Sequence, residues 1–172
     1  KTGTDRIFEA YQELRDDNIE YVINLQGDEP MLDIEDVTNL LKKTIKKKSK
    51  ISTLACQIED EKFFLNKNIV KVTTKEELNQ NNLSTASSFT REIENTQKNI
   101  YHHIGIYIYN VSYLEKFVQL EQTQNEKLQK LEQLRLIDNN IEIDVGLAKT
   151  KPIGVDTDED YLEIKKIMEY KN

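Results

Sequence analysis

The chain has 172 residues, of which 37% are hydrophobic and 32% charged, and its formal net charge is −7. This length suffices for one domain with a substantial core, while the acidic balance and the lack of a basic stripe exclude a general nucleic-acid-binding protein. No apolar run approaches the roughly 20 residues that a membrane-spanning helix needs. The single cysteine, Cys56, excludes an intramolecular disulfide framework and is compatible with a reducing cytoplasm.

Residues 2–58 alternate between helical and strand patterns. Thr4 is a candidate N-cap of a first helix, whose apolar stripe at helical spacing consists of Ile7, Phe8, Tyr11 and Leu14. β-Branched and aromatic runs predict strands at 20–26 and 51–58, the second of which places Cys56 in the core. Asp33 caps the helix between them, whose expected buried face is Ile34, Val37, Leu40, Leu41 and Ile45. This order of elements predicts a parallel sheet with crossover helices.

The rest of the chain adds strands at 69–73, 83–89 and 103–109, in a region expected to be antiparallel or mixed. Two helices are predicted at 111–120 and 126–137, the second with a stripe of Leu128, Leu131, Leu134 and Leu136. An alternating pattern predicts a strand at 141–145, and a final helix follows with Tyr161, Ile164, Ile167 and Met168 facing inward. The expected fold is a single three-layer α/β/α domain over residues 1–172, with a mixed sheet.

The stretch Gln26-Gly27-Asp28-Glu29-Pro30 places a carboxylate, Asp28, just beyond a predicted strand. Gly27 tolerates backbone conformations that other residues avoid, and Pro30 cannot continue a strand. Ligands of open α/β sheets bind at the carboxyl ends of strands, and Mg²⁺ prefers carboxylate oxygens and substrate phosphates. From these residues alone, a solvated acidic turn is an equally good interpretation.

A second acidic turn, Gly154-Val155-Asp156-Thr157-Asp158-Glu159-Asp160, precedes the final helix. Two such carboxylates brought together would hold a divalent cation over a polyphosphate. Taken alone, the second turn is better explained as an acid-rich helix start, because acids suit the positive end of the helix dipole.

Six motifs stand in one order along the chain: Gly3-Thr4-Asp5-Arg6, Asn24–Pro30, Asn68-Ile69-Val70-Lys71-Val72, His103-Ile104-Gly105-Ile106-Tyr107, Leu131-Glu132-Gln133-Leu134-Arg135 and Gly154-Val155-Asp156-Thr157. Together they resemble the 3-deoxy-manno-octulosonate cytidylyltransferase (CMP-Kdo synthetase) family over almost the whole chain. The resemblance implies a nucleotide-diphospho-sugar transferase fold. It also implies that CTP activates 3-deoxy-manno-octulosonate (Kdo) to CMP-Kdo, with release of pyrophosphate, for lipopolysaccharide biosynthesis.

The resemblance also implies residue roles and partners. Asp28 and Asp156 would be catalytic and bind Mg²⁺. The residues implied near the nucleotide are Thr2, Gly3, Arg6 and Gln26. Those implied near the sugar are Gln26, Arg91, His103, Glu132 and Gln133. A cytoplasmic homodimer is implied, with no membrane or nucleic-acid partner. From the residues alone, His103 is equally well a satisfied strand-end histidine, and Glu132 and Arg135 are better explained as a solvated helix face.

The chain departs from the family pattern in three places. Thr2 replaces a serine, which keeps the hydroxyl, and Phe89-Thr90-Arg91-Glu92-Ile93 lacks the usual proline. Members of the family begin with a strand and an Arg-, Ser-, Gly- and Lys-rich loop that grips the CTP phosphates, and the 172 residues do not contain this loop. We therefore expect a family domain without its amino-terminal segment, with little turnover by these residues alone.

Two other functions remain open at this point. A relative with the same chemistry could activate another acidic sugar, such as sialic acid or 8-amino-Kdo. A remnant without catalysis could bind a sugar or a partner subunit.

Overall fold

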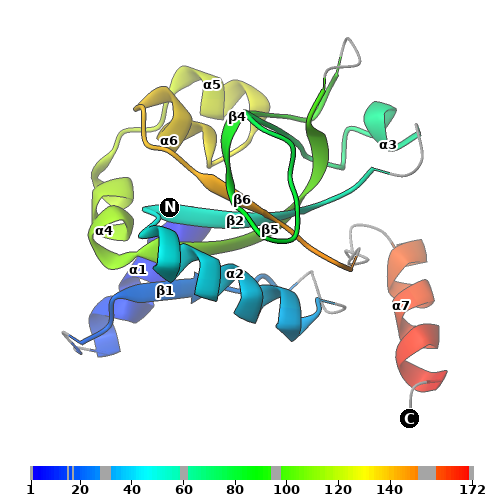
Figure 1. Cartoon of the computed structure of the whole chain (residues 1–172), viewed down its shortest axis with the longest axis horizontal. Coiled ribbons are helices and arrows are strands. Elements are labelled where there is room, and N and C mark those ends of the chain that lie inside the picture. The colour runs from blue at the N-terminus through cyan, green and yellow to red at the C-terminus, as the bar shows by residue number, and fades with distance from the viewer. Residues whose placement is uncertain are drawn as a thin grey trace.

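The computed structural model describes residues 2–14, 16, 18–27, 32–58, 62–93, 98–150 and 158–170. Its elements, in chain order, are α1 (Gly3–Leu14), β1 (Tyr21–Asn24), α2 (Ile34–Lys47), β2 (Ile51–Cys56), α3 (Lys62–Leu65), β3 (Lys71–Thr74), β4 (Ser84–Thr90), β5 (Ile100–Asn110), α4 (Val111–Gln119), α5 (Gln124–Gln129), α6 (Leu134–Asp138), β6 (Asp144–Leu147) and α7 (Asp158–Tyr170). Helices lie on both sides of one sheet (Figure 1). The predicted three-layer mixed α/β fold is confirmed.

Strand β5 is the centre of the sheet. The strand order is β1-β5-β2-β6-β4-β3, and β3 also pairs with β5, so that five strands close a ring. Strands β1 and β2 run in the same direction, but β5 lies antiparallel between them, so the sheet predicted to be parallel in this region is mixed. Among the described strands, β2 and β6 form the parallel pair. The antiparallel pairing expected for the middle region is confirmed.

The ladder between β2 and β5 contains a bulge. Thr53 pairs with Tyr107 but Leu54 pairs with Ile104, so β5 advances three residues where β2 advances one. The Thr53 hydroxyl lies in this bulge and donates to the carbonyl of Ile106 at 2.6 Å, with the carbonyl of Ile104 at 3.2 Å. Bulges interrupt ladder hydrogen bonds, and here a buried side chain supplies the missing donor.

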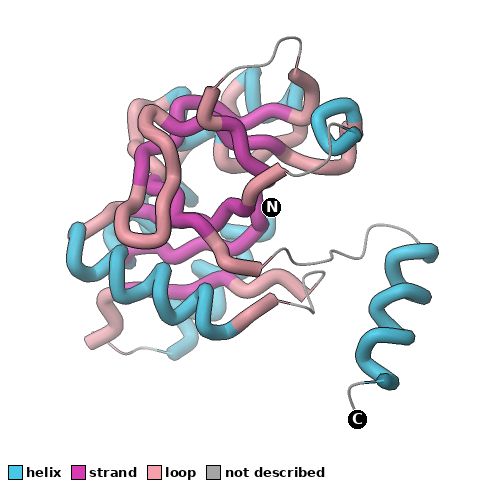
Figure 2. Tube along the Cα trace, turned by 45° about the vertical axis from the view of Figure 1, so that its right-hand side comes forward, coloured by secondary structure: helices cyan, strands magenta, loops and turns pink. Residues whose placement is uncertain are grey.

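The strands lie among helices in the trace of Figure 2. Two hydrophobic cores lie on opposite faces of the sheet. Even-numbered residues of β5 (Ile104, Ile106 and Ile108) pack with Val37 and Leu40 of α2. Odd-numbered residues of β5 (Tyr101, Tyr107 and Tyr109) belong to the other core, against α1, α4 and α6. This alternation is the period of two that a strand imposes. Cys56 is buried in the α2-side core, as predicted.

The predicted helix at 126–137 is wrong, because the structure has two short helices there. A capping box between Thr123 and Glu126 starts α5 early, and Lys130 ends it in a left-handed conformation with φ 53°. Leu128, predicted to be buried, is 74% exposed. Glu132 and Gln133 therefore lie in the connection between α5 and α6.

Several other side chains differ from the sequence prediction. Thr4 is helical and buried rather than an N-cap. Leu14, Ile34, Ile45 and Tyr161 are exposed, whereas Ile164 is buried as predicted. The buried face of α2 is shifted because Asp36 and Thr44 are hydrogen-bonded inside it. The strand predicted at 141–145 begins at Asp144, since the amide of Ile141 instead closes α6 by donating to Leu136.

Gly146 of β6 tests the packing between α2 and the sheet. A Cβ at this position would lie 2.9 Å from Leu40 Cδ1 and 3.2 Å from Leu83 Cδ2. We expect Gly146→Ala to lower the free energy of unfolding by about 1–3 kcal/mol through overpacking. Urea denaturation followed by circular dichroism measures this change.

Gly27→Ala is the matched control. Its added Cβ would meet no atom within 4 Å, and no described glycine has a positive φ. Gly27 therefore does not use the left-handed backbone conformations that glycine tolerates. An equal loss of stability in both variants would contradict the packing argument.

Candidate functional site

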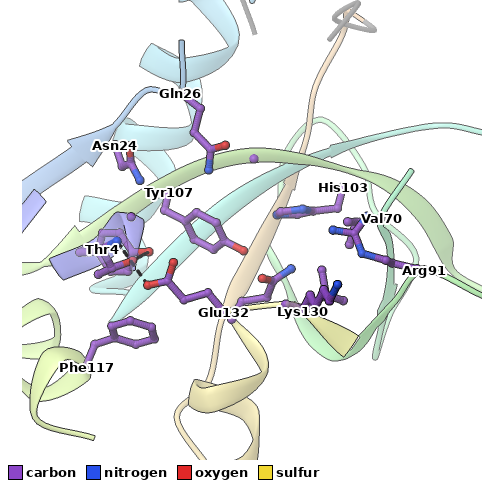
Figure 3. A pocket seen from close by; sticks show the side chains of 15 residues that line it. Thr4, Asn24, Gln26, Val70, Arg91, His103, Tyr107, Phe117, Lys130 and Glu132 are labelled. Atoms are coloured by element: carbon purple, nitrogen blue, oxygen red, sulfur yellow. Dashed lines mark hydrogen bonds between the residues drawn. The ribbon is translucent and has the colours of Figure 1, made fainter. Parts of the chain in front are cut away.

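A pocket of about 270 Å³ lies between β5, the start of α1, the end of β1 and the α5–α6 connection (Figure 3). The sequence-predicted site residues on its wall are Gly3, Gln26, Arg91, His103, Glu132 and Gln133. Five of these residues come from four of the six motifs, and Arg91 comes from the separate stretch at 89–93. The fold thus brings together residues predicted separately for the nucleotide and for the sugar.

Two predicted residues that the structure describes, Thr2 and Arg6, are not on this wall. The backbone amide of Thr2 donates to Asp5 Oδ2 at 2.6 Å, and Arg6 is exposed; neither lines the pocket. Asp28 and Asp156 lie outside the described residues. Their role in binding a metal stays a prediction.

Glu132, in the α5–α6 connection, is hydrogen-bonded to the start of α1. Its Oε1 accepts from the backbone amide of Thr4 at 3.3 Å, as Figure 3 shows. A carboxylate suits this position because the first amides of a helix lack partners within the helix. The Thr4 hydroxyl is 3.4 Å from the hydroxyl of Tyr109 on β5. Glu132 is thereby fixed across the pocket from the sheet.

A buried ion pair supports the same connection. Arg135 donates from Nε and Nη2 to the two carboxylate oxygens of Glu126 at 2.8 and 2.6 Å, and both residues are at most 4% exposed. Burial raises the pKa of Glu126, but hydrogen bonds from Arg135 and Gln122 outweigh this effect and lower it. The guanidinium also lies 4.6 Å from the ring centre of Phe117. The interpretation of Arg135 as part of a solvated helix face is wrong.

His103 is held among aromatic rings and a hydroxyl. Its Nε2 is 2.9 Å from Thr53 Oγ1, and its ring centre is 5.1 Å from Phe89 and 5.5 Å from Tyr107. Burial, and secondarily the neighbouring His102, lower the pKa of His103 to about 3. The imidazole is therefore neutral near pH 7, and it contributes hydrogen bonding rather than charge.

Tyr107 is a pocket residue that the sequence analysis missed. It is 6% exposed, and its hydroxyl has no hydrogen-bond partner among the described residues. Its ring reaches toward the middle of the pocket in Figure 3. Burial raises the pKa of this phenol well above 10, so it stays a hydrogen-bond donor. Its spacing from His103 on one strand face is the signal that could have identified it.

Gly105, which lies between His103 and Tyr107 on β5, leaves room for the side chain of Gln26. A Cβ on Gly105 would lie 3.2 to 3.3 Å from the side-chain amide of Gln26. The amide thus lies against the backbone of β5. This explains why the glycine of the motif at 103–107 and the glutamine of the motif at 24–30 belong to one site.

Arg91 is held at the pocket by backbone groups and by Lys71. Its Nη1 donates to the carbonyls of Lys67 and Asn68 at 3.1 and 3.3 Å. Lys71 is fully buried, and its ammonium donates to the carbonyls of Asn66 at 2.6 Å and of Arg91 at 2.8 Å. Burial, and then the charge of Arg91, lower the pKa of Lys71. Both cations therefore donate to backbone carbonyls of the segment at 66–68.

Comparisons with known proteins agree with the family resemblance of the sequence motifs. Residues 1–143 match the family described as cytidylyltransferase. The chain is 41% identical to the 3-deoxy-manno-octulosonate cytidylyltransferase of Thermodesulfovibrio yellowstonii, over 92% of the chain and 66% of that protein. It is 38% identical to the enzyme of the same name from Agrobacterium fabrum, over 98% and 67% respectively. The chain thus spans about two thirds of the length of these curated relatives.

Solved structures agree with these sequence matches. A CMP:2-keto-3-deoxy-manno-octonic acid synthetase complexed with CTP superposes with a TM-score of 0.85 at 28% identity, over all of this chain and 70% of that one. An apo UDP-glucose pyrophosphorylase gives 0.68 at 14% identity, over 99% and 61%, which shows the shared fold alone. The chain belongs to the cytidylyltransferase family and, within it, to the 3-deoxy-manno-octulosonate cytidylyltransferases.

Proposed function

We propose that the protein activates Kdo with CTP to give CMP-Kdo and pyrophosphate, and that the pocket binds the sugar. The anomeric hydroxyl forms the new bond to the α-phosphorus as the bond to pyrophosphate breaks, and the hydroxyl proton is lost. Such transfers depend on positioning and charge neutralisation more than on covalent help. The observation that carries the proposal is the convergence of Gln26, Arg91, His103, Glu132 and Gln133 on one pocket in a chain of this family.

The side chains suit a polyhydroxylated acid. The two hydrogen bonds of Arg91 use Nη1, so among its described contacts Nη2 and Nε are left for a carboxylate. Glu132 offers acceptor oxygens, while Gln26 and Gln133 each offer a donor and an acceptor. A pocket that pairs each sugar hydroxyl penalises a sugar lacking one, because its own polar groups are then left unpaired.

Mg²⁺ is part of the proposal. Within the described residues, no group of three His, Cys, Asp or Glu side chains could hold a metal. The proposed ligands are Asp28 and Asp156. Their carboxylates are the hard oxygen ligands that Mg²⁺ prefers. The bound ion would neutralise charge on the phosphates of CTP.

The described residues next to both acidic turns support this assignment. Asp36, in the first turn of α2, is 3% exposed and accepts from the amides of Lys149 and Thr150 at 3.0 to 3.1 Å, and from the Thr150 hydroxyl at 2.8 Å. Asp36 comes eight residues after Asp28 (36 − 28), and Thr150 comes six before Asp156 (156 − 150). One buried carboxylate therefore ties together the chain next to both turns.

The remaining partners are proposed by family analogy. A homodimer in the cytoplasm fits the single buried cysteine, and no described helix is long and apolar enough to span a membrane. Pyrophosphate release measured with CTP and a panel of Kdo, 8-amino-Kdo and sialic acid tests the substrate. Preference for Kdo supports the proposal. Preference for another acidic sugar shows that Kdo is not the substrate. Sugar binding without any turnover in the full-length protein would favour the non-catalytic alternative.

Gln133 is predicted to select the sugar rather than to act on CTP. It is 9% exposed and lines the pocket in the rigid connection before α6. In the active enzyme, Gln133→Ala should raise the KM for Kdo about tenfold, as expected for one lost hydrogen bond that leaves its partner unpaired. The KM for CTP should stay nearly unchanged in steady-state kinetics.

The control for this variant is Gln129→Ala on the exposed end of α5, which should alter neither constant. A rise in the KM for CTP, with the KM for Kdo unchanged, would show that Gln133 is misassigned.

Asp28 and Asp156 are predicted to converge on one metal, with carboxyl groups within about 8 Å, so that one hydrated ion bridges them. Asp28→Asn or Asp156→Asn in the active enzyme should lower turnover by at least about 100-fold, because a preorganised electrostatic contact is lost. Unfolding free energy should change little. Activity is followed against Mg²⁺ concentration.

Asp138→Asn, on the exposed end of α6, is the matched control and should retain full activity. A ligand-free crystal structure with the carboxyl groups of Asp28 and Asp156 on opposite faces of the sheet would rule out the shared site.

A further inference from the structure

The Thr53 hydroxyl connects the bulge in β5 to the imidazole of His103. Thr53 is fully buried, and its Oγ1 lies 2.6 Å from the carbonyl oxygen of Ile106, 3.2 Å from that of Ile104 and 2.9 Å from His103 Nε2. A hydroxyl has one proton to donate and two lone pairs that accept. Three contacts around one hydroxyl therefore fix where the protons lie.

The Thr53 hydroxyl donates its proton to a backbone carbonyl within the bulge. Both carbonyl oxygens can only accept, and a distance of 2.6 Å between two oxygens without a proton between them is repulsive. Thr53 therefore donates to Ile106, and it has no proton left for the imidazole. The remaining contact, at 2.9 Å, is a hydrogen bond only if His103 Nε2 donates to Thr53 Oγ1.

We propose that Thr53 is a positioning residue that holds His103 as the Nε2–H tautomer, so that Nδ1 presents a lone pair to a hydroxyl group of the ligand. In a neutral imidazole, one nitrogen donates and the other accepts. No described residue is hydrogen-bonded to His103 Nδ1, and His103 lines the pocket. The Thr53 hydroxyl thus orients the imidazole of His103, and Nδ1 is the hydrogen-bond acceptor in the pocket.

The surroundings of His103 support this assignment. The imidazole is neutral near pH 7, because burial and then His102 lower its pKa to about 3. Tyr107, four residues further along β5, has a buried hydroxyl without a hydrogen-bond partner among the described residues. Burial raises the pKa of Tyr107, and the nearby Thr53 hydroxyl opposes this effect. The pocket therefore offers an acceptor at His103 and a donor at Tyr107. This pair suits a ligand hydroxyl, which both donates and accepts.

The identity of the ligand rests on the proposed function, but the tautomer does not. The chain contains two histidines, His102 and His103, so selective ¹⁵N-histidine labelling yields four ring-nitrogen signals. Assignment follows from a His102→Asn variant. Long-range proton–nitrogen spectra of the ligand-free chain at pH 7 should show His103 with a protonated Nε2 and an unprotonated Nδ1. A protonated Nδ1, or equal mixing of both forms, overturns the proposal.

Three variants test whether Thr53 sets the tautomer. Thr53→Val keeps the shape but removes the acceptor, and it should release His103 into a mixture of tautomers. Thr53→Ser should restore the wild-type signals. Thr44→Val is the matched control, because Thr44 is also fully buried and its hydroxyl bonds to Leu40 and Ser52 away from the pocket. Wild-type signals in Thr53→Val, or a mixture in Thr44→Val, overturn the role of Thr53.

Titration with Kdo tests the ligand. Saturating Kdo should shift the His103 Nδ1 signal, and Thr53→Val should weaken Kdo binding roughly tenfold while Thr53→Ser and Thr44→Val bind normally. Binding of Kdo without a change at Nδ1 overturns the proposed contact. If Kdo does not bind at all, the proposed function fails, whereas the ligand-free spectra still decide the tautomer. If Thr53→Val does not fold, the wild-type spectra alone decide the proposal.

Discussion

The alternation of side chains along β5 is the constraint on which both the core and the pocket depend. Its even-numbered isoleucines fill the space beneath α2, and its odd-numbered residues form the other core and one wall of the pocket. A shift of register by one residue would exchange the two sets. The hydrophobic requirement on the α2 side therefore fixes where His103 and Tyr107 point. The bulge at Thr53 adjusts this register locally, and its buried hydroxyl replaces the ladder bonds that the bulge breaks.

Buried charged side chains hold the connecting segments around the pocket in place. The Glu126–Arg135 pair supports the connection that carries Glu132, Lys71 supports Arg91, and Asp36 ties α2 to the end of β6. Breaking a buried pair by removing one partner typically costs about 3–5 kcal/mol, because an uncompensated charge stays buried. Hydrophobic residues of similar volume could stabilise these positions equally well. They could not hold a polar side chain in one direction, which a binding site requires.

The sequence was informative where local pattern decides structure. The strands at 51–58 and 103–109 followed from β-branched and aromatic runs, and Asp33 caps α2 as expected. Pairing could not be predicted in the same way, because β5 enters between β1 and β2 from far along the chain. The break at Lys130 was also hidden, since its leucine spacing continues through a left-handed residue that is not glycine.

The candidate site shows the same division. Gln26, Arg91, His103, Glu132 and Gln133 were identified from motifs, and the fold places them around one pocket. Lys71, Thr53 and Tyr107 were missed as contributors to the site. Lysine is almost never fully buried, so a strand lysine is expected to face solvent. Threonine and tyrosine are ordinary strand residues. Their importance arises from contacts with residues distant in sequence, which no local pattern encodes.

The pocket must also bind anionic ligands in a protein that is itself acidic. The chain carries a net charge of −7, and the proposed ligands, a sugar acid and a nucleoside triphosphate, are both anions. Charges farther away than about 8 Å are largely screened at physiological ionic strength, so nearby cations decide whether an acidic sugar binds. Arg91 and Lys130 are the cations among the described residues on the wall, which also carries the carboxylate of Glu132. Because Lys130 is exposed, the ordered charge comes from Arg91, which two loop carbonyls hold and whose own carbonyl Lys71 binds. A fully buried lysine near a binding site is thus explained by the need to fix one arginine in an otherwise acidic protein.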